Sequence, residues 1–239
     1  MRRLARSGVT AQATVHDLHG MLDEMRVFKD DTEVALMQRA ATISAQAHER
    51  DARLAARHVR VRDRSRTAAR ISPQRRPGAR LHADRGRMAA NACVLHYNVN
   101  NAQSRDGDLI LIDAGCRILT ATPPTSPALT PSTAASSEPQ KVLYELVLAA
   151  QEAALAVIRP GTIYTDMHDA AVRVLAQGML DLGLLDKEKF ASVDEVIAER
   201  AHQQFYMHGT GHWLGLDVHD AGAYRATEAE GKPSRPLQA

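Results

Sequence analysis

Three histidines in a short glycine-rich segment near the end of the sequence restrict what this chain can form. They stand in the run His208-Gly-Thr-Gly-His212-Trp-Leu-Gly-Leu-Asp-Val-His219-Asp220, at spacings of four and seven residues. Neutral imidazole binds divalent metals, and glycine lets the backbone approach a ligand closely. A solvated face would not mix glycine, apolar side chains and imidazoles in this way. The segment therefore predicts a metal or substrate site, and the alternative is a set of structural histidines.

Two further candidates lie in apolar stretches that read as strands. Asp113 follows the run Leu-Ile-Leu-Ile that ends at Ile112, and His96 lies in the apolar stretch 92–97, with turn residues at 105–107 between the two. A carboxylate at the end of a buried strand destabilises the fold unless it is paired or binds a metal. Taken alone, Asp113 fits a metal ligand and an ordinary strand end equally, and His96 fits a core histidine.

Helical patterns precede and follow these strands. Asp30 and Glu33 have the spacing of a capping box, which predicts a helix from about Asp30 to Arg53. A second helix is predicted from the Ser137 cap to the stop at 159–161, and a third from a Thr165 cap to about Leu182. The apolar positions that repeat at helical spacing are Leu36, Ala40, Ile43 and Ala47 in the first helix and Val142, Leu146, Ala150, Ala153 and Val157 in the second.

Two long stretches show no periodicity and are predicted to be irregular. Residues 57–88 are rich in arginine and carry only two acidic residues, and residues 117–139 consist mainly of Pro, Thr, Ser and Ala. A basic block is typical of a nucleic-acid surface or a disordered arm, and the second composition is typical of a linker. Aromatic residues make up only 4% of the chain, which argues against stacking on bases.

Composition also bears on the compartment. The chain has 239 residues, 44% of them hydrophobic, and only two cysteines, too few for a disulfide framework. No apolar run approaches the ~20 residues that span a bilayer, and no hydrophobic segment follows the arginine-rich start. A cytoplasmic protein without a membrane partner is therefore expected.

Together, and in this order, the segments resemble the pita-bread metallopeptidases and, among them, aminopeptidase P, the Xaa-Pro aminopeptidases. The resemblance covers 29–50, the two strands, and 140–221. It implies an α+β fold, a curved antiparallel sheet with outer helices, here incomplete at the C-terminus. Residues 1–28 would then be the remnant of an N-terminal domain and its linker, and 29–239 a truncated catalytic domain.

The resemblance also implies a role for each candidate. Asp113 and His212 match metal ligands, and His96, His208 and His219 match histidines that hold the substrate carbonyl and move protons. Family members use two divalent ions, commonly manganese, to activate a hydroxide that cleaves the bond before a proline at the second position of a peptide. Relatives often form homo-oligomers, so a homo-oligomer is a further expectation, whereas no nucleic acid partner is expected.

The sequence departs from the family pattern at three of five metal ligands. The second aspartate should lie about eleven residues beyond Asp113, where the chain reads Pro-Pro-Thr-Ser at 123–126, and Glu228 and Glu230 lie too early for the two glutamates. Two divalent ions ~3.5 Å apart repel by roughly 20 kcal/mol at an effective dielectric of about 20, which bridging carboxylates must offset. Asp113 and His212 alone do not suffice, so the chain as written is predicted to be inactive.

Out-of-frame translation would explain both irregular stretches. Degenerate codons for residues 121–128, read from the third base, permit Tyr-Ala-x-Asp-Ile-Thr-Arg, the missing family segment. Codons for 57–68, read from the second base, permit a family-like run with four glutamates. The hypothesis is that both segments are frame-shifted. Two other functions remain open: a prolidase-like or non-catalytic pita-bread protein, and a nucleic-acid-binding protein that uses residues 57–87.

Overall fold

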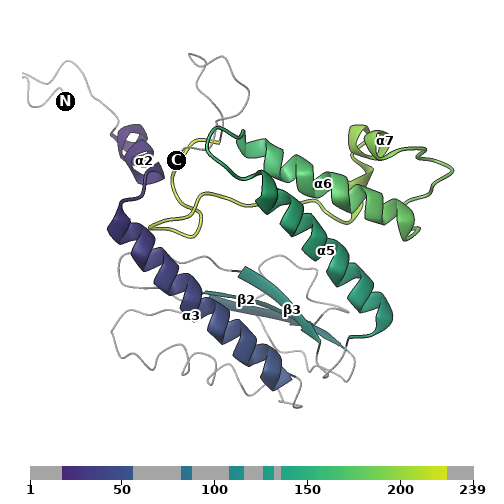
Figure 1. Ribbon diagram of the computed structural model, residues 1–239, viewed down its shortest axis with the longest axis horizontal. Helices are drawn as coiled ribbons and strands as arrows, with labels where there is room; N and C mark the ends of the chain where they lie inside the picture. The colour runs from purple at the N-terminus through teal and green to yellow at the C-terminus, as the bar shows by residue number, and fades with distance from the viewer. Residues whose placement is uncertain (1–17, 56–81, 88–107, 116–125, 132–135, 225–239) are drawn as a thin grey trace, which may run out of the picture.

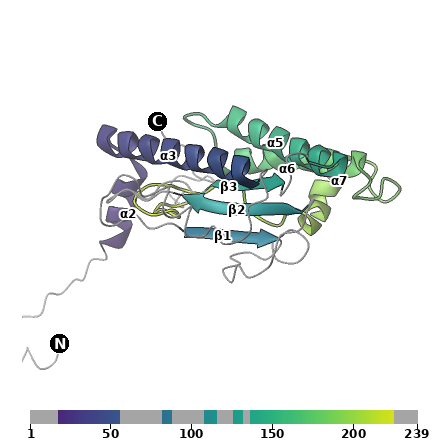
Figure 2. The same cartoon turned by 90° about the horizontal axis from the view of Figure 1, so that it is seen from below.

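The described part of the chain contains a three-stranded antiparallel sheet and several helices, of which α3 runs along the sheet (Figure 1; Figure 2). The computed structural model describes residues 18–55, 82–87, 108–115, 126–131 and 136–224. The expected strand at 92–97, the turn at 105–107 and the candidate His96 lie outside these ranges. Helix α3 packs against the sheet, whereas α5 and α6 pack against each other.

The first described helices are α2 (His19–Val27) and α3 (Asp31–Ala55). Two reciprocal bonds start α3: the Glu33 N–H donates to the Asp30 carboxylate at 2.8 Å, and the Asp30 N–H donates to the Glu33 carboxylate at 3.0 Å. The predicted capping box is therefore confirmed. The apolar face is also confirmed, since Ala40 is fully buried. Sequence reasoning did not predict α2, which has no buried residue.

The α5–α6 pair forms the main helical layer. Helix α5 (Glu138–Val157) begins after Ser137, whose N–H donates to the Gln140 side chain at 2.9 Å, and it ends before the predicted stop. Helix α6 (Tyr164–Asp181) begins two residues earlier than the predicted Thr165 cap implies. Its N-cap is Ile163, whose N–H donates to the Asp166 carboxylate at 3.2 Å, so the Thr165 cap was wrong and a carboxylate in the first turn takes that role.

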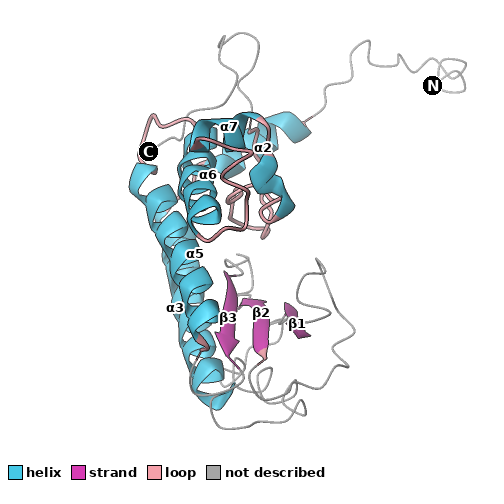
Figure 3. Ribbon diagram, turned by 90° about the vertical axis from the view of Figure 1, so that its right-hand side faces the viewer, coloured by secondary structure: helices cyan, strands magenta, loops and turns pink. Residues whose placement is uncertain are grey.

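The sheet is formed by β1 (His82–Arg87), β2 (Leu109–Gly115) and β3 (Ser126–Pro131), with β2 in the centre (Figure 3). Asp113 of β2 stands opposite Asp84 of β1 and Pro127 of β3. The outer strands lie in the two stretches predicted to be irregular, so that prediction fails for 82–87 and 126–131. Backbone hydrogen bonds to β2 require no particular side chains, and an edge strand tolerates the prolines of β3.

The described core lies between α5, α6 and the segment that follows. Helix α7 (Val193–Ala198) and the short 3₁₀ helix η1 (Ala201–Gln204) pack against α6. Where α5 crosses α6, a Cβ added at Gly178 would lie 2.3 Å from a Leu146 methyl group, so glycine permits this close approach. The fully packed members of the core are Ala150, Ala154, Met167, Ala171, Leu175, Ala176, Met179, Leu180, Leu185, Phe190, Val196 and Ala201.

Arg200, between α7 and η1, has a left-handed backbone with φ 56° and ψ 26°. A side chain with a Cβ destabilises this conformation by about 1 kcal/mol, whereas glycine adopts it freely. Replacing Arg200 with glycine is expected to raise the free energy of unfolding by about 0.5–1 kcal/mol in urea titrations. The neighbouring Glu199→Gly, at φ −82°, is the matched control and is expected to lower it. An equal loss in both variants would contradict this account.

Candidate functional site

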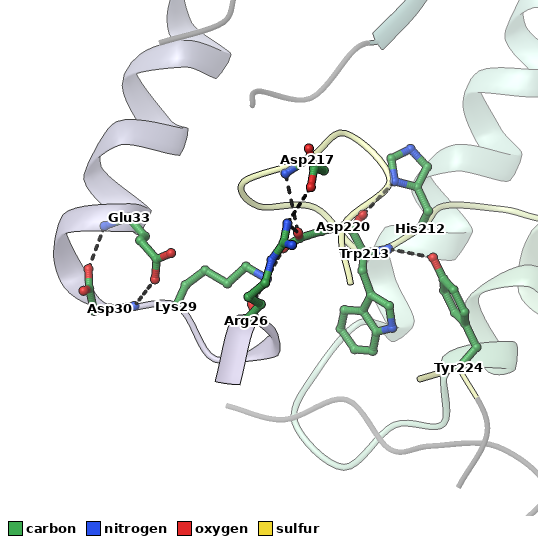
Figure 4. A network of polar contacts seen from close by, with 9 residues as sticks. All are labelled: Arg26, Lys29, Asp30, Glu33, His212, Trp213, Asp217, Asp220 and Tyr224. Atoms are coloured by element: carbon green, nitrogen blue, oxygen red, sulfur yellow. Dashed lines mark hydrogen bonds and ion pairs between the residues drawn. The ribbon is translucent and has the colours of Figure 1, made fainter. Parts of the chain in front are cut away.

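The histidine segment forms an irregular loop between η1 and the end of the described chain. Two backbone bonds fold it back on itself: the Asp220 N–H donates to the Trp213 carbonyl at 3.0 Å, and the Gly215 N–H donates to the Asp217 carbonyl at 3.2 Å. Gly211 adopts φ 74°, which favours glycine, so this position supports a turn that other residues would strain. The loop brings His212, Trp213 and Asp220 together (Figure 4).

His212 has a geometry suited to a metal ligand. Its Nδ1 lies 2.8 Å from the Trp213 carbonyl oxygen, which can only accept, so Nδ1 carries the hydrogen. In the neutral ring the lone pair is then on Nε2, the arrangement in which protein imidazoles bind metals. The ring of His219 stacks on that of His212, with centroids 4.0 Å apart and planes 23° apart. The structure therefore brings two of the predicted site residues into contact.

The buried carboxylate of Asp220 holds the histidine loop against the α2–α3 junction. The side chain of Asp220 is 1% exposed and accepts bonds from Arg26 Nη2 at 2.5 Å and from Lys29 Nζ at 3.1 Å (Figure 4). Arg26 also donates to Asp217 at 2.6 Å, and the Lys29 ammonium donates to the Arg26 carbonyl at 2.6 Å. Residues almost two hundred positions apart thus connect the α2–α3 junction to the histidine loop.

The charged groups of this cluster shift the pKa values of Asp220 and Arg26. Burial alone would raise the pKa of Asp220, but the hydrogen bond and charge of Lys29, the Ala221 N–H and the charge of Arg26 together hold it below its usual range. The bond to Asp217 is the main cause that raises the pKa of Arg26. Asp220 is therefore a carboxylate and Arg26 a cation near neutral pH. Sequence reasoning assigned no role to these four residues.

Three aromatic rings pack beside the loop. Tyr164 of α6 contacts Tyr224 edge to face at 4.7 Å and Trp213 at 5.6 Å between centroids. The Tyr224 hydroxyl accepts from the Trp213 N–H at 3.1 Å, and the indole N–H donates to the Ala223 carbonyl at 3.3 Å. Burial raises the pKa of Tyr164, so its hydroxyl stays protonated. This cluster orients Trp213, whose carbonyl fixes the His212 tautomer.

The other predicted residues are placed less decisively. Asp113 is half-buried on the central strand β2, and His208 and His219 are exposed on the loop, while His96 lies outside the described residues. Within the part of the chain that the structure describes, no three His, Cys, Asp or Glu side chains gather where one metal ion could bind. In the same ranges no helix has the length and apolar character needed to cross a membrane.

The comparisons with known proteins decide the family. The model of metallopeptidase family M24 matches residues 35–239. The chain belongs to this family. It is similar to the Xaa-Pro aminopeptidase of Escherichia coli, with 36% identity over 94% of this chain and 50% of that protein. The Xaa-Pro aminopeptidase of Haemophilus influenzae is 40% identical over 87% of this chain and 47% of its own length.

Solved structures of M24 proteins give the same fold. The aminopeptidase PepP of Pseudomonas aeruginosa matches 99% of this chain with a TM-score of 0.84 at 38% identity, over 52% of its own chain. A zinc-substituted aminopeptidase P of E. coli in complex with product matches with a TM-score of 0.82 at 34% identity. The predicted α+β pita-bread fold and the resemblance to aminopeptidase P are thus confirmed. The chain spans about half the length of the curated relatives it matches.

Proposed function

We propose that this chain is the metal-binding part of an Xaa-Pro aminopeptidase, acting on peptides with proline at the second position. The observation that carries the proposal is the Nδ1–H bond of His212 to the Trp213 carbonyl, which presents Nε2 to a divalent ion. Asp113 is the proposed carboxylate ligand. In this proposal residues 29–239 belong to the catalytic domain and 1–28 to the end of a preceding domain.

The substrate contacts in this proposal come from the histidines around His212. His219 stacks on the His212 ring, and His208 directly precedes the turn formed by Gly209, Thr210 and Gly211. Both histidine side chains are exposed. Imidazoles in such positions can donate to a peptide carbonyl and accept a proton. His96 is assigned to the same task from the sequence alone. Manganese is the proposed ion, and the match to a metallopeptidase family supports a divalent metal in general.

We further propose that the chain as written binds a single ion weakly and does not hydrolyse peptides. Its described residues do not bring three metal-binding side chains together, and Pro124 stands where the family pattern has its second aspartate. Without bridging carboxylates, the repulsion between two divalent ions, roughly 20 kcal/mol, is not offset. Frame-shifted coding DNA remains the proposed origin of this difference. Sequencing that DNA across residues 53–141 would reveal an open frame that restores the aspartate.

A one-residue addition tests the metal centre. Pro124→Asp is expected to raise the affinity for Mn²⁺ by about tenfold in electron paramagnetic resonance titrations, because it adds a carboxylate ligand. Pro123→Asp is the matched control, since it adds the same charge one position away, and His212→Ala should abolish the gain. Cleavage of a peptide with proline at the second position, assayed by chromatography in the presence of MnCl₂, is expected for neither the unmodified chain nor any of these variants.

Each outcome bears on one part of the proposal. Turnover by the unmodified chain that His212→Ala removes would contradict the claim of inactivity while supporting the site. Equal Mn²⁺ affinities in the Pro124→Asp and Pro123→Asp variants would contradict the assigned aspartate position. No Mn²⁺ binding to any variant would favour the alternative, a non-catalytic pita-bread protein.

A further inference from the structure

A hydroxyl at the centre of the glycine-flanked turn is held from two sides. Thr210 Oγ1 lies 3.0 Å from Nδ1 of His168 on α6 and 2.5 Å from the Tyr206 hydroxyl. The rings of His168 and Tyr206 are stacked, 24° apart in plane with centroids 5.9 Å apart. Both contacts are partly buried. The three groups form a short hydrogen-bonded chain in which the threonine can donate to one partner and accept from the other.

The Thr210 side chain contacts α6 from the turn formed by Gly209, Thr210 and Gly211, whose two glycines leave the backbone flexible. Thr210 stands between Gly209 and Gly211, and Gly211 adopts φ 74°. Glycine loses more conformational freedom on folding than other residues, so side-chain contacts must supply the order of such a turn. Helix α6 also approaches Gly211 through Met167, the residue before His168, because a Cβ at Gly211 would lie 3.0 Å from the Met167 methyl group. The Thr210 hydroxyl thus adds hydrogen bonds to an otherwise apolar contact between α6 and the turn.

His168 is suited to a permanent, uncharged contact. Burial lowers the pKa of His168, the charge of Asp169 opposes this shift, and the neighbouring His202 adds to it. The ring is therefore neutral near pH 7 and keeps a hydrogen-bonding nitrogen toward Thr210. His168 belongs to α6, whose position is fixed by the core through Met167 and Leu175. A rigid helix thereby determines where the loop backbone lies two residues before His212.

We propose that His168 and Tyr206 are positioning residues that act through the Thr210 hydroxyl to orient the imidazole of His212. The part of this inference that concerns metal affinity rests on the proposed function, whereas the part that concerns the tautomer of His212 does not. Thr210 precedes His212 by only two positions, and Nδ1 of His212 donates to the Trp213 carbonyl at 2.8 Å, so a shift of Thr210 would change the orientation of the ring. Loss of the anchor would let the turn rotate and break that bond.

The test removes one hydroxyl at a time. Thr210→Val keeps the shape of the side chain and deletes the hydroxyl, whereas Thr210→Ser retains it and serves as the rescue. His168→Leu and Tyr206→Phe each delete one partner. The matched control is Thr42→Val, which removes a hydroxyl that donates to the Gln38 carbonyl at 2.9 Å, at an exposed position of α3. Unfolding in urea is followed in parallel, so that comparisons are made only under conditions where each variant is folded.

The deciding readout is the tautomer of His212, measured from side-chain ¹⁵N chemical shifts. The unmodified chain, Thr210→Ser and Thr42→Val are expected to show His212 protonated on Nδ1. Thr210→Val and His168→Leu are expected to show a mixture, with a shift toward protonation on Nε2. Unchanged His212 signals in Thr210→Val would overturn the proposal even if that variant were less stable, because a purely structural contact would lower stability alone.

Titration with MnCl₂ separates this inference from the proposed function. Where Mn²⁺ broadens the His212 signals, Thr210→Val is expected to require about tenfold more Mn²⁺ for the same broadening, as for other contacts behind a metal ligand. If Mn²⁺ has no effect on any variant but the tautomer still shifts, the proposed function fails and the positioning role stands. Equal broadening in Thr210→Val and Thr42→Val would overturn the link to metal affinity.

Discussion

Replacing Asp220 with asparagine is expected to lower the free energy of unfolding by about 3–5 kcal/mol. The carboxylate is 1% exposed and compensates two cations, Arg26 at 2.5 Å and Lys29 at 3.1 Å. Asparagine has the same shape but no charge, so the Lys29 ammonium, itself only 13% exposed, would remain buried without its counter-ion. Urea denaturation at neutral pH, followed by Trp213 fluorescence, measures the loss.

The control is an ion pair of similar distance at the surface. Arg173 and Asp194 lie 2.9 Å apart with side chains 63% and 79% exposed, so Asp194→Asn is expected to change stability by less than about 1 kcal/mol. A similar loss in both variants would show that the burial of Asp220 is not what matters. Lys29→Met together with Asp220→Asn should lower stability by less than the sum of the single changes, because the two groups share one interaction.

The pH dependence of this difference has a defined sign. The pKa of Asp220 is lower in the folded chain than its unfolded value of about 3.9, so its stabilising contribution is fully present above that value. The contribution is lost as the pH falls through the folded pKa. The stability gap between the unmodified chain and Asp220→Asn should therefore be constant from about pH 5 to about pH 7 and shrink below about pH 4. A gap that grew on acidification would contradict the assigned ionisation.

Local signals in the sequence predicted α3, α5 and α6 but not α2 or α7. The Asp30–Glu33 and Ser137–Gln140 pairs act over three residues, so their chemistry is legible without knowledge of the fold. The predicted start of α6 was wrong, because the Asp166 carboxylate accepts from the Ile163 N–H and the helix begins before Thr165. Strand β2 was legible as an apolar run. Its neighbours β1 and β3 were not, since their pairing depends on backbone groups that every sequence offers.

The sequence predicted the histidines of the candidate site but not the side chains that hold the histidine loop in place. Spacing and residue type singled out His212 and His219, and the structure stacks them. The contacts of Asp220 with Arg26 and Lys29 span more than 190 positions, a distance over which no periodic pattern carries information. His168 was missed because a single histidine on an amphipathic helix looks like any half-buried polar residue. Such contacts follow from the fold, and so they emerge only with it.

The glycine at position 215 shows how closely the loop and the ionic cluster depend on each other. A Cβ at Gly215 would lie 2.0 Å from Asp220 Oδ2 and 2.9 Å from Lys29 Cε, which is closer than atoms can approach. Glycine in this loop was expected to let the backbone approach a ligand, and at Gly215 the group that approaches is the protein's own buried carboxylate. Gly215→Ala must therefore displace the carboxylate from its cations or push the loop away.

Gly215→Ala is expected to lower the free energy of unfolding by about 3 kcal/mol, since it combines overpacking with a disturbed buried ion pair. Gly209→Ala is the matched control, because no atom lies within 4 Å of the added Cβ, and its effect should stay within about 0.5 kcal/mol. In an Asp220→Ala background the clashing oxygen is gone, and Gly215→Ala should then add less than about 1 kcal/mol. An undiminished loss in that background would mean that the backbone at position 215, and not the carboxylate, requires glycine.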